Sequence, residues 1–300
     1  MKSLTFLILI TVVHTVLFAG PSDTHKPLVT PQWLAERLND PTVVILNVAQ
    51  NRRDYLKEHI PGARFLWPGW MAIANPELNF ELVPLAQLDT LLDGLGISNS
   101  STVVLYGVAG NVSPTARMYI TMEYLGMGDR TYVLDGGLEA WKAEGRSVTK
   151  ELPVYQRASF TPQVKPDVLV NADFVQQRLN ASGKTIIDAR APQFYGGNGG
   201  GYPRAGRIPG AVNIYFTTLI DSTNKYVSLD SMKTRFDQAG IKPGDDVTAY
   251  CHVGQTASTV YLAAKQLGYN VHLYDGSFED WSGREDLPVF VPAKPDSLTR

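Results

Sequence analysis

Five segments of this chain occur twice, and this internal repeat constrains the possible folds more than any other feature of the sequence. The two copies keep the same order, and matching residues lie 140 to 148 positions apart. A repeat of this kind predicts two copies of one folding unit. The paired segments are residues 30–38 and 171–179, 43–47 and 184–188, 60–63 and 208–211, 102–106 and 246–250, and 134–141 and 274–281.

Each copy alternates short apolar runs with longer helical stretches. The runs are nearly continuous, which is typical of parallel strands covered on both faces. Helices are predicted over residues 114–125 and 256–267, and each ends at a glycine, Gly126 or Gly268. This alternation predicts the α/β class, with a parallel sheet flanked by helices in each copy. The predicted strands centre on Ile45, Val104, Val133, Ile187, Val247 and Leu273.

The length and the prolines place the domain boundaries. A chain of 300 residues suits two mid-sized domains. Three prolines, Pro153, Pro162 and Pro166, interrupt any regular pattern between the copies. We therefore predict an N-terminal domain at residues 28–147, a linker at 148–166 and a C-terminal domain at 167–292.

The first 20 residues have the pattern of a secretory signal. Lys2 precedes an apolar run over residues 4–13, and Ala19 and Gly20 supply small residues before Pro21. This order predicts a signal peptide over residues 1–20 and export to the periplasm or the medium. An uncleaved membrane anchor is the alternative. After cleavage we expect no stable membrane insertion, because no other stretch approaches the roughly 20 apolar residues that cross a bilayer.

Charge and composition exclude several classes of protein. The formal net charge is −2, so the chain lacks the basic footprint of a nucleic-acid-binding protein. A single cysteine leaves no disulfide within the chain. The five histidines are scattered, and we therefore predict no metal site and no cofactor. Because the repeat supplies its own domain pair, we expect a monomer.

The one cysteine, Cys251, follows the predicted strand at residues 247–250 and precedes the predicted helix. Sites in open parallel sheets form at the carboxyl ends of strands. A thiol there meets free backbone N–H groups and the positive end of a helix dipole, and both favour the thiolate. Gly254 allows the loop to curl without a side chain at its centre. The alternative is a buried, unreactive cysteine, but this position favours a reactive one.

Several motifs together resemble the rhodanese-like tandem-domain sulfurtransferases, over about residues 30–288. They are Cys251-x-x-Gly254-x-Thr256, Asp188-Ala-Arg190, residues 207–211, and Asp275 with Trp281 six positions later. The resemblance implies that Cys251 takes sulfur from a small-molecule donor as a persulfide. It then passes the sulfur to a thiophilic acceptor, cyanide or a thiol. Gly107 stands where Cys251 stands in the other copy, so the first copy is expected to be catalytically silent.

The resemblance also implies the substrate-binding residues. Arg190 matches an arginine directed at the anionic donor, and Asp188 is expected to order the loops rather than to react. His252 is not expected to act as a base, because neighbouring loop residues seldom face each other. The glycine-rich insertion 196–201 is interpreted as a flap beside the site. The predicted substrate-binding set is Arg190, His252, Val253, Gly254, Gln255 and Thr256.

The loop departs from both common patterns of the family. Thiosulfate-type members carry two cations after the cysteine, whereas this loop has His252 and Val253. Mercaptopyruvate-type members carry glycine and then serine or threonine. We predict thiosulfate as a weakly bound donor, bound better as the pH falls towards about 6, where His252 gains a proton. The alternatives are mercaptopyruvate as donor, a non-catalytic sulfur-binding module, and a phosphatase or arsenate reductase of the same fold. The last is disfavoured because the loop does not end in arginine.

Overall fold

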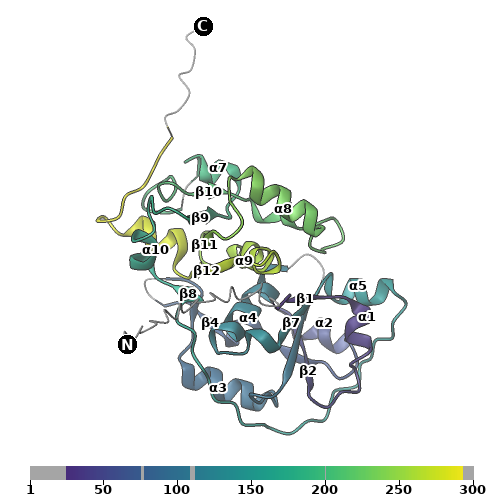
Figure 1. The fold of residues 1–300 in the computed structure, drawn as a ribbon. Coiled ribbons are helices and arrows are strands. Elements are labelled where there is room, and N and C mark those ends of the chain that lie inside the picture. Colours follow the sequence, from purple (N-terminus) through teal and green to yellow (C-terminus); the bar gives the residue numbers. More distant parts are fainter. Residues whose placement is uncertain (1–24, 76–77, 109–111, 200, 293–300) are drawn as a thin grey trace, which may run out of the picture.

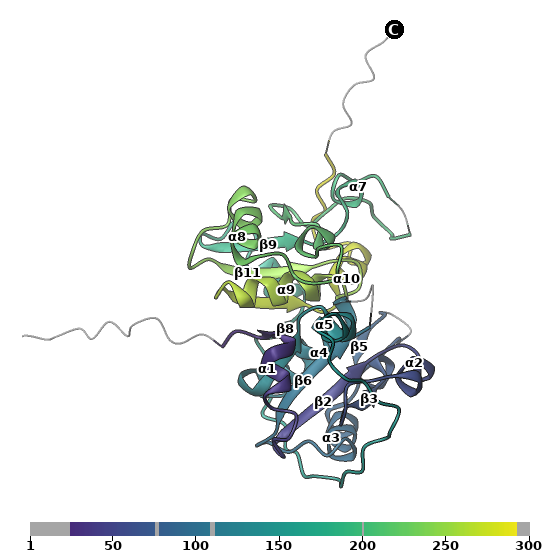
Figure 2. The same cartoon turned by 90° about the vertical axis from the view of Figure 1, so that its right-hand side faces the viewer.

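The computed structural model describes residues 25–75, 78–108, 112–199 and 201–292, so the predicted signal peptide lies outside the described residues. Two five-stranded parallel sheets form the framework, one in each half of the chain (Figures 1 and 2). The predicted fold class, two α/β units that each carry a parallel sheet flanked by helices, is confirmed.

The first sheet has the strand order β1-β7-β6-β2-β3, with every neighbouring pair parallel. Its strands are β1 (Leu28–Val29), β2 (Val43–Val48), β3 (Arg64–Leu66), β6 (Thr102–Gly107) and β7 (Thr131–Leu134). A small antiparallel hairpin joins β4 (Ala72–Ile73) to β5 (Glu81–Leu82). The helices are α1 (Pro31–Ala35), α2 (Arg52–Lys57), α3 (Leu85–Gly94), α4 (Val112–Tyr124) and α5 (Gly137–Ala143), with short 3-10 turns η1 (Pro68–Trp70) and η2 (Gly128–Arg130).

The second sheet has the order β10-β9-β11-β12-β8 and is also parallel throughout. Its strands are β8 (Leu169–Val170), β9 (Lys184–Asp188), β10 (Val212–Asn213), β11 (Asp246–Tyr250) and β12 (Asn270–Tyr274). The helices are α6 (Ala172–Gln176), α7 (Pro192–Tyr195), α8 (Leu229–Gln238), α9 (Ala257–Gln266) and α10 (Ser277–Gly283), with the 3-10 turn η3 (Phe216–Leu219). Residues 150–165, which connect the first half of the chain to the second, contain no helix or strand.

The sequence repeat corresponds to a repeat of individual hydrogen bonds. Two buried tyrosine hydroxyls accept backbone N–H groups at the same distance of 3.2 Å, Tyr106 from Ile60 and Tyr250 from Ile208. Two buried tryptophans, Trp141 and Trp281, each donate Nε1–H to a carbonyl 2.8 Å away. The two halves therefore share side-chain architecture as well as topology.

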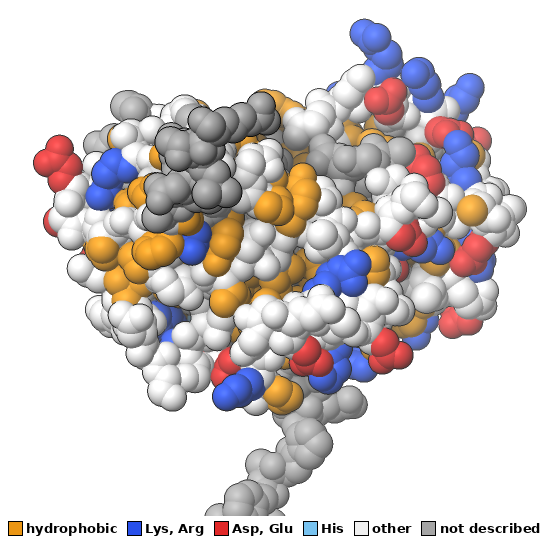
Figure 3. All heavy atoms as spheres, turned by 90° about the horizontal axis from the view of Figure 1, so that it is seen from above, with side chains coloured by type: hydrophobic (Ala, Val, Ile, Leu, Met, Phe, Trp, Pro, Cys, Tyr) orange, Lys and Arg blue, Asp and Glu red, His pale blue; other side chains and the backbone are white. Residues whose placement is uncertain are grey.

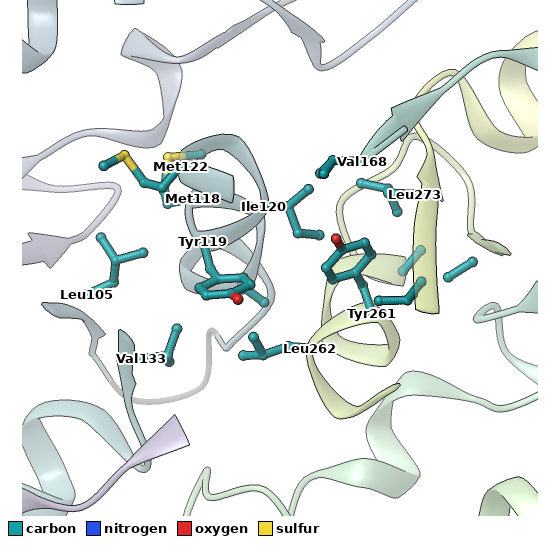
Figure 4. Packing of buried hydrophobic residues seen from close by; sticks show 14 of the residues in the cluster. Leu105, Met118, Tyr119, Ile120, Met122, Val133, Val168, Tyr261, Leu262 and Leu273 are labelled. Atoms are coloured by element: carbon teal, nitrogen blue, oxygen red, sulfur yellow. The ribbon is translucent and has the colours of Figure 1, made fainter. Parts of the chain in front are cut away.

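Helices α4 and α9, the elements predicted at residues 114–125 and 256–267, pack against each other between the two sheets (Figure 1). All residues of α4 from Ser113 to Glu123 are buried. A helix buried on all sides is expected where one face covers its own sheet and the opposite face meets a second domain. Figure 4 shows Tyr119 and Ile120 of α4 facing Tyr261 and Leu262 of α9. One buried apolar cluster therefore runs through both halves.

A buried charged group, Glu123, also crosses this interface. Its carboxylate accepts the Tyr261 hydroxyl at 3.0 Å and pairs with the Lys265 ammonium, both on α9. Nearer the N-terminal ends of the helices, the hydroxyls of Ser113 and Thr259 are 2.9 Å apart. These contacts satisfy polar groups that would otherwise be buried without partners. Among the residues described, no helix is long and apolar enough to span a membrane.

We expect Glu123→Ala to lower the free energy of unfolding by about 2–3 kcal/mol, because it leaves a buried hydroxyl and a half-buried ammonium without their partner. Thermal and urea unfolding of the purified chain measure this change. Asp237→Ala is the matched control, since it breaks the exposed ion pair with Lys233 on α8 and should leave the transition unchanged. Equal losses in both variants would contradict a special role for the buried pair.

Candidate active site

Cys251 lies at the carboxyl end of the central strand β11, directly before the loop that leads into α9. Its side chain is buried, with 1% of the residue exposed. The start of α10 holds this loop in place, because the N–H of Phe278 donates to the Cys251 carbonyl at 3.1 Å and the N–H of Glu279 donates to the His252 carbonyl at 3.0 Å. The predicted position of the cysteine, between a strand end and a helix start, is therefore what the structure shows.

The backbone of the loop supplies hydrogen-bond donors for an anion, with one exception. The N–H of Cys251 itself donates to Ser277 Oγ at 3.1 Å and is therefore not available to an anion. Within the described residues, the N–H groups of residues 252–256 donate to no acceptor, and no side chain caps α9. Unsatisfied N–H groups at a helix N-terminus favour a bound anion.

Arg190, the predicted donor-binding cation, is itself paired. Its guanidinium donates to both carboxylate oxygens of Asp188, the shortest contact being 2.7 Å, and to the Gly206 carbonyl at 2.8 Å. Burial disfavours the charged guanidinium, but Asp188 outweighs burial and raises the pKa of Arg190. Asp188 also accepts the Tyr250 hydroxyl, in agreement with its predicted ordering role. The pair is close to neutral overall, and the role of Arg190 towards the donor stays a prediction.

His252 lies among aromatic rings. It stacks on Tyr202 with ring centroids 5.2 Å apart and meets the edge of Phe194 at 4.7 Å. Burial, followed by the nearby charge of Arg190, lowers the pKa of His252 below its ordinary 6.5. The imidazole is therefore neutral over a wider pH range than the sequence indicated. Tyr202, which follows the glycine-rich insertion, was not identified from the sequence, although the insertion itself was expected beside the site.

The rest of the loop combines one enclosed glycine with three partly exposed residues. Gly254 adopts φ +75°, a backbone conformation that favours glycine. Val253, Gln255 and Thr256 are partly exposed. Gln255 and Thr256 line a cleft of about 500 Å³ between the halves, together with Ser113 of the first half and Phe216 of the second. Gln255 and Thr256 therefore lie on the wall of this cleft, whereas Gly254 is buried and Val253 is partly exposed outside the cleft lining.

The sequence did not identify Arg117, a cation that the first half places against the loop. It lies in α4 with 1% of its side chain exposed and forms an ion pair with Asp275, with Nη1 and Oδ1 2.6 Å apart. Two other arginines near the insertion are engaged elsewhere. Arg204 donates to carbonyl groups at the end of α10, and Arg207 donates to the Tyr195 carbonyl.

The position in the first half that corresponds to Cys251 has different surroundings in the part of the chain that the structure describes. Gly107 ends β6 where Cys251 follows β11, and the cavity beside it measures only about 20 Å³. Tyr226 and Asn224 of the second half line this cavity, and the Tyr226 N–H donates to Asp135 Oδ1 at 2.8 Å. The first copy therefore carries no thiol at this position, and the cavity that the described residues form beside it is small.

Gly107→Cys is consequently expected to restore no sulfur transfer in a Cys251→Ser background, because the pocket around residue 107 is filled from the other half. Steady-state assays with thiosulfate and cyanide test this, and alkylation by iodoacetamide reports on whether the new thiol is accessible. The matched control is Gly107→Cys in a chain that keeps Cys251, which should retain full turnover and so show that the substitution leaves the fold intact. Turnover by the double variant would show that the first pocket opens.

Comparison with known proteins places these features in a family. The Rhodanese-like domain matches the chain twice, at residues 30–144 and 171–284. A thiosulfate sulfurtransferase of Azotobacter vinelandii is 31% identical over 87% of this chain and 96% of its own length. Thiosulfate/3-mercaptopyruvate sulfurtransferase 2 of Arabidopsis thaliana is 28% identical over 90% of this chain and 88% of its own. The crystal structure of YnjE superposes with a TM-score of 0.80, at 25% identity, over 91% of this chain and 70% of that one. This chain belongs to the rhodanese-like family and contains two copies of its domain.

Proposed function

We propose that this chain is a sulfurtransferase that moves the outer sulfur of thiosulfate to a thiophilic acceptor through a persulfide on Cys251. The observation that carries the proposal is the placement of the only cysteine in the sequence. Cys251 lies at the carboxyl end of a central strand, in a loop whose next five N–H groups have no acceptor within the described residues. Relatives named as thiosulfate sulfurtransferases support the same reaction.

The reaction has two steps that balance. The Cys251 thiolate attacks the outer sulfur of thiosulfate, a new S–S bond forms, and the S–S bond of thiosulfate breaks as sulfite leaves with the electron pair. Cyanide or a thiolate then attacks the outer sulfur of the persulfide, and thiocyanate or a new persulfide leaves as Cys251 regains its thiolate. The loop N–H groups and the start of α9 stabilise the negative charge throughout.

The charges around the loop favour weak binding of a dianion. Arg190 is neutralised by Asp188, and Val253 supplies no cation at its position in the loop. Two negative charges moved into a partly dehydrated cleft require compensation by cations or several donors. Mercaptopyruvate, which carries a single negative charge, is the second candidate donor, and a relative from Arabidopsis thaliana bears both names.

The cleft lined by Gln255 and Thr256 is the route by which we propose that donor and acceptor approach the loop. Its other walls include Ser113, Thr217, Phe216 and Asp221, a mixture of hydroxyl, apolar and acidic groups around a space suited to small molecules. Charged side chains of both signs are interspersed on the face shown in Figure 3, rather than gathered in one patch. We propose that the partners are small molecules rather than nucleic acids, and that the chain acts as a monomer.

We also propose export, on the pattern of residues 1–20. Expression in the source organism, cell fractionation and N-terminal sequencing of the purified protein test it. A mature protein that begins near residue 21 in the periplasm or the medium is the expected result. A cytoplasmic protein that retains Met1 would contradict the proposal.

Cys251→Ser is expected to abolish sulfur transfer and leave the fold unchanged, because serine replaces the sulfur nucleophile with little change in volume. Intact-mass measurement after thiosulfate treatment should show one added sulfur in the unmodified chain, removed by cyanide, and none in the variant. A sulfur adduct that forms but does not transfer to any acceptor would favour the sulfur-binding alternative. Turnover that survives in the variant would refute the assignment of Cys251.

Val253→Lys is expected to lower the Michaelis constant for thiosulfate about tenfold or more, since one charge-assisted contact contributes about 1.5–3 kcal/mol. Val253→Met, similar in length but uncharged, is the matched control and should leave the constant unchanged. The constant for mercaptopyruvate should change less in Val253→Lys, because that donor carries one charge fewer. Tight thiosulfate binding by the unmodified chain would show that another cation reaches the anion.

The Michaelis constant for thiosulfate should also depend on pH. Because the pKa of His252 is lowered, its imidazole stays neutral above pH 6.5 and adds no positive charge to the loop there. Thiosulfate binding should therefore be independent of His252 at neutral pH. It should improve only when the pH is low enough to protonate His252, which is a lower pH than its ordinary pKa of 6.5 would require. His252→Gln should remove this acidic improvement and leave the Michaelis constant at neutral pH nearly unchanged.

A further inference from the structure

The silent first half contributes a buried cation to the catalytic half. Arg117, from the middle of α4, pairs through Nη1 with Asp275, the residue between β12 and α10, at 2.6 Å. Its Nη2 donates to the Phe80 carbonyl beside β5 at 3.3 Å. Arg117 therefore joins two elements of its own half to the segment that follows β12 in the other half.

The catalytic loop packs directly on this pair. A Cβ atom at Gly254 would lie 2.7 Å from the Asp275 carbonyl oxygen and 3.0 Å from Arg117 Nη1. Both distances are at or below the shortest that a side chain tolerates, so the arginine and the loop backbone are in contact. The segment that begins at Asp275 also holds the other end of the loop, because Ser277 Oγ accepts the Cys251 N–H.

We propose that Arg117 is a positioning residue for the Cys251 loop. Its pairing with Asp275 sets the place of the segment from 275 to 279, and that segment determines where Cys251, His252 and Gly254 lie. The row of N–H groups that faces the sulfur anion thus depends on a side chain of the half that has no nucleophile. Nothing in this role requires Arg117 to touch the substrate.

The surrounding charges explain why loss of this cation would move the loop. Burial, followed by the charge of Asp275, raises the pKa of Glu81 to about 7, and Asp280 and Glu279 act in the same direction. Arg117 is the cation that opposes this effect on Glu81. Without Arg117, Asp275 would face the Glu81 carboxylate with little exposure to water, and repulsion would favour displacement of the segment.

The aspartate that pairs with Arg117 has an equivalent in the first copy of the repeat. Asp135 and Asp275 occupy equivalent positions in the repeat, and each is engaged by the opposite half: Asp135 accepts the Tyr226 N–H, whereas Asp275 receives the Arg117 cation. The first contact borders the small cavity beside Gly107. The second lies against the catalytic loop, which supports a role in the loop geometry and not only in domain docking.

The experiment uses the single thiol of the full chain. Arg117→Met should lower both the rate of Cys251 alkylation by iodoacetamide at neutral pH and the single-turnover rate of persulfide formation from thiosulfate, each about tenfold or more. It should also move the midpoint of the alkylation profile to higher pH. Arg117→Lys, which can still pair with Asp275, should recover part of both rates.

Lys265→Met is the matched control, because it breaks a different ion pair between the halves, that of Lys265 on α9 with Glu123 on α4, away from the loop. It should lower the thermal midpoint and leave the alkylation profile unchanged. If Arg117→Met does not fold, Asp275→Asn provides the same readout with little change in shape. Unchanged alkylation in the Arg117 and Asp275 variants, or an equal change in Lys265→Met, would overturn the inference.

This inference rests on the proposed role of Cys251 as sulfur carrier, and the two can fail separately. Alkylation reports on the loop whether or not sulfur is transferred. An unmodified chain that forms no persulfide would therefore refute the proposed function, while its alkylation profile would still decide the role of Arg117.

Discussion

The packing of α4 against α9 is the interaction on which the rest of the structure depends. Each helix covers its own sheet and also packs against the other helix. The side chains between the two helices therefore belong to one hydrophobic core that both domains share. Apolar contacts such as those of Ile120 and Leu262 supply most of the stabilisation, since burial contributes about 25 cal/mol per Å². The paired Glu123 and the hydroxyls of Ser113 and Thr259 add specificity, because only one alignment of the helices satisfies them.

This interface also borders two cavities of very different size. Tyr226 lines the cavity of about 20 Å³ beside Gly107, and the cleft of about 500 Å³ beside Gln255 and Thr256 adjoins it, since Val112 and Asn224 line both. The polar contacts across the interface are not symmetric: the second half contributes the Tyr226 N–H to Asp135, whereas the first half contributes the Arg117 side chain to Asp275.

Much of the fold could be predicted from the sequence because the relevant signals are local. The repeat, the apolar runs and the glycines after the helices identified two parallel α/β units, and the position of Cys251 followed from the strand before it and the helix after it. Arg117, Ser277 and Tyr202 could not be predicted in the same way. Each reaches the loop from a distant part of the chain, and which residues meet across a domain interface depends on how the domains dock. The pairing of Arg190 with Asp188 was also missed, although the two residues are neighbours, because nothing local shows whether an arginine faces its own strand end or a ligand.

Ser277 shows that the copy with Cys251 differs from the copy with Gly107 in a second residue beside the loop. It adopts φ +53°, while Gly137 at the equivalent place in the first half adopts φ +56°. Glycine takes this conformation without penalty, but serine there costs on the order of 1–3 kcal/mol. In the copy with Cys251 the hydroxyl offsets part of that cost, because Ser277 Oγ accepts the Cys251 N–H and donates to the Tyr274 carbonyl. A cost of this kind, present in the copy with the cysteine and absent at the equivalent Gly137, is what is expected where the position of one thiol matters more than the stability of one turn.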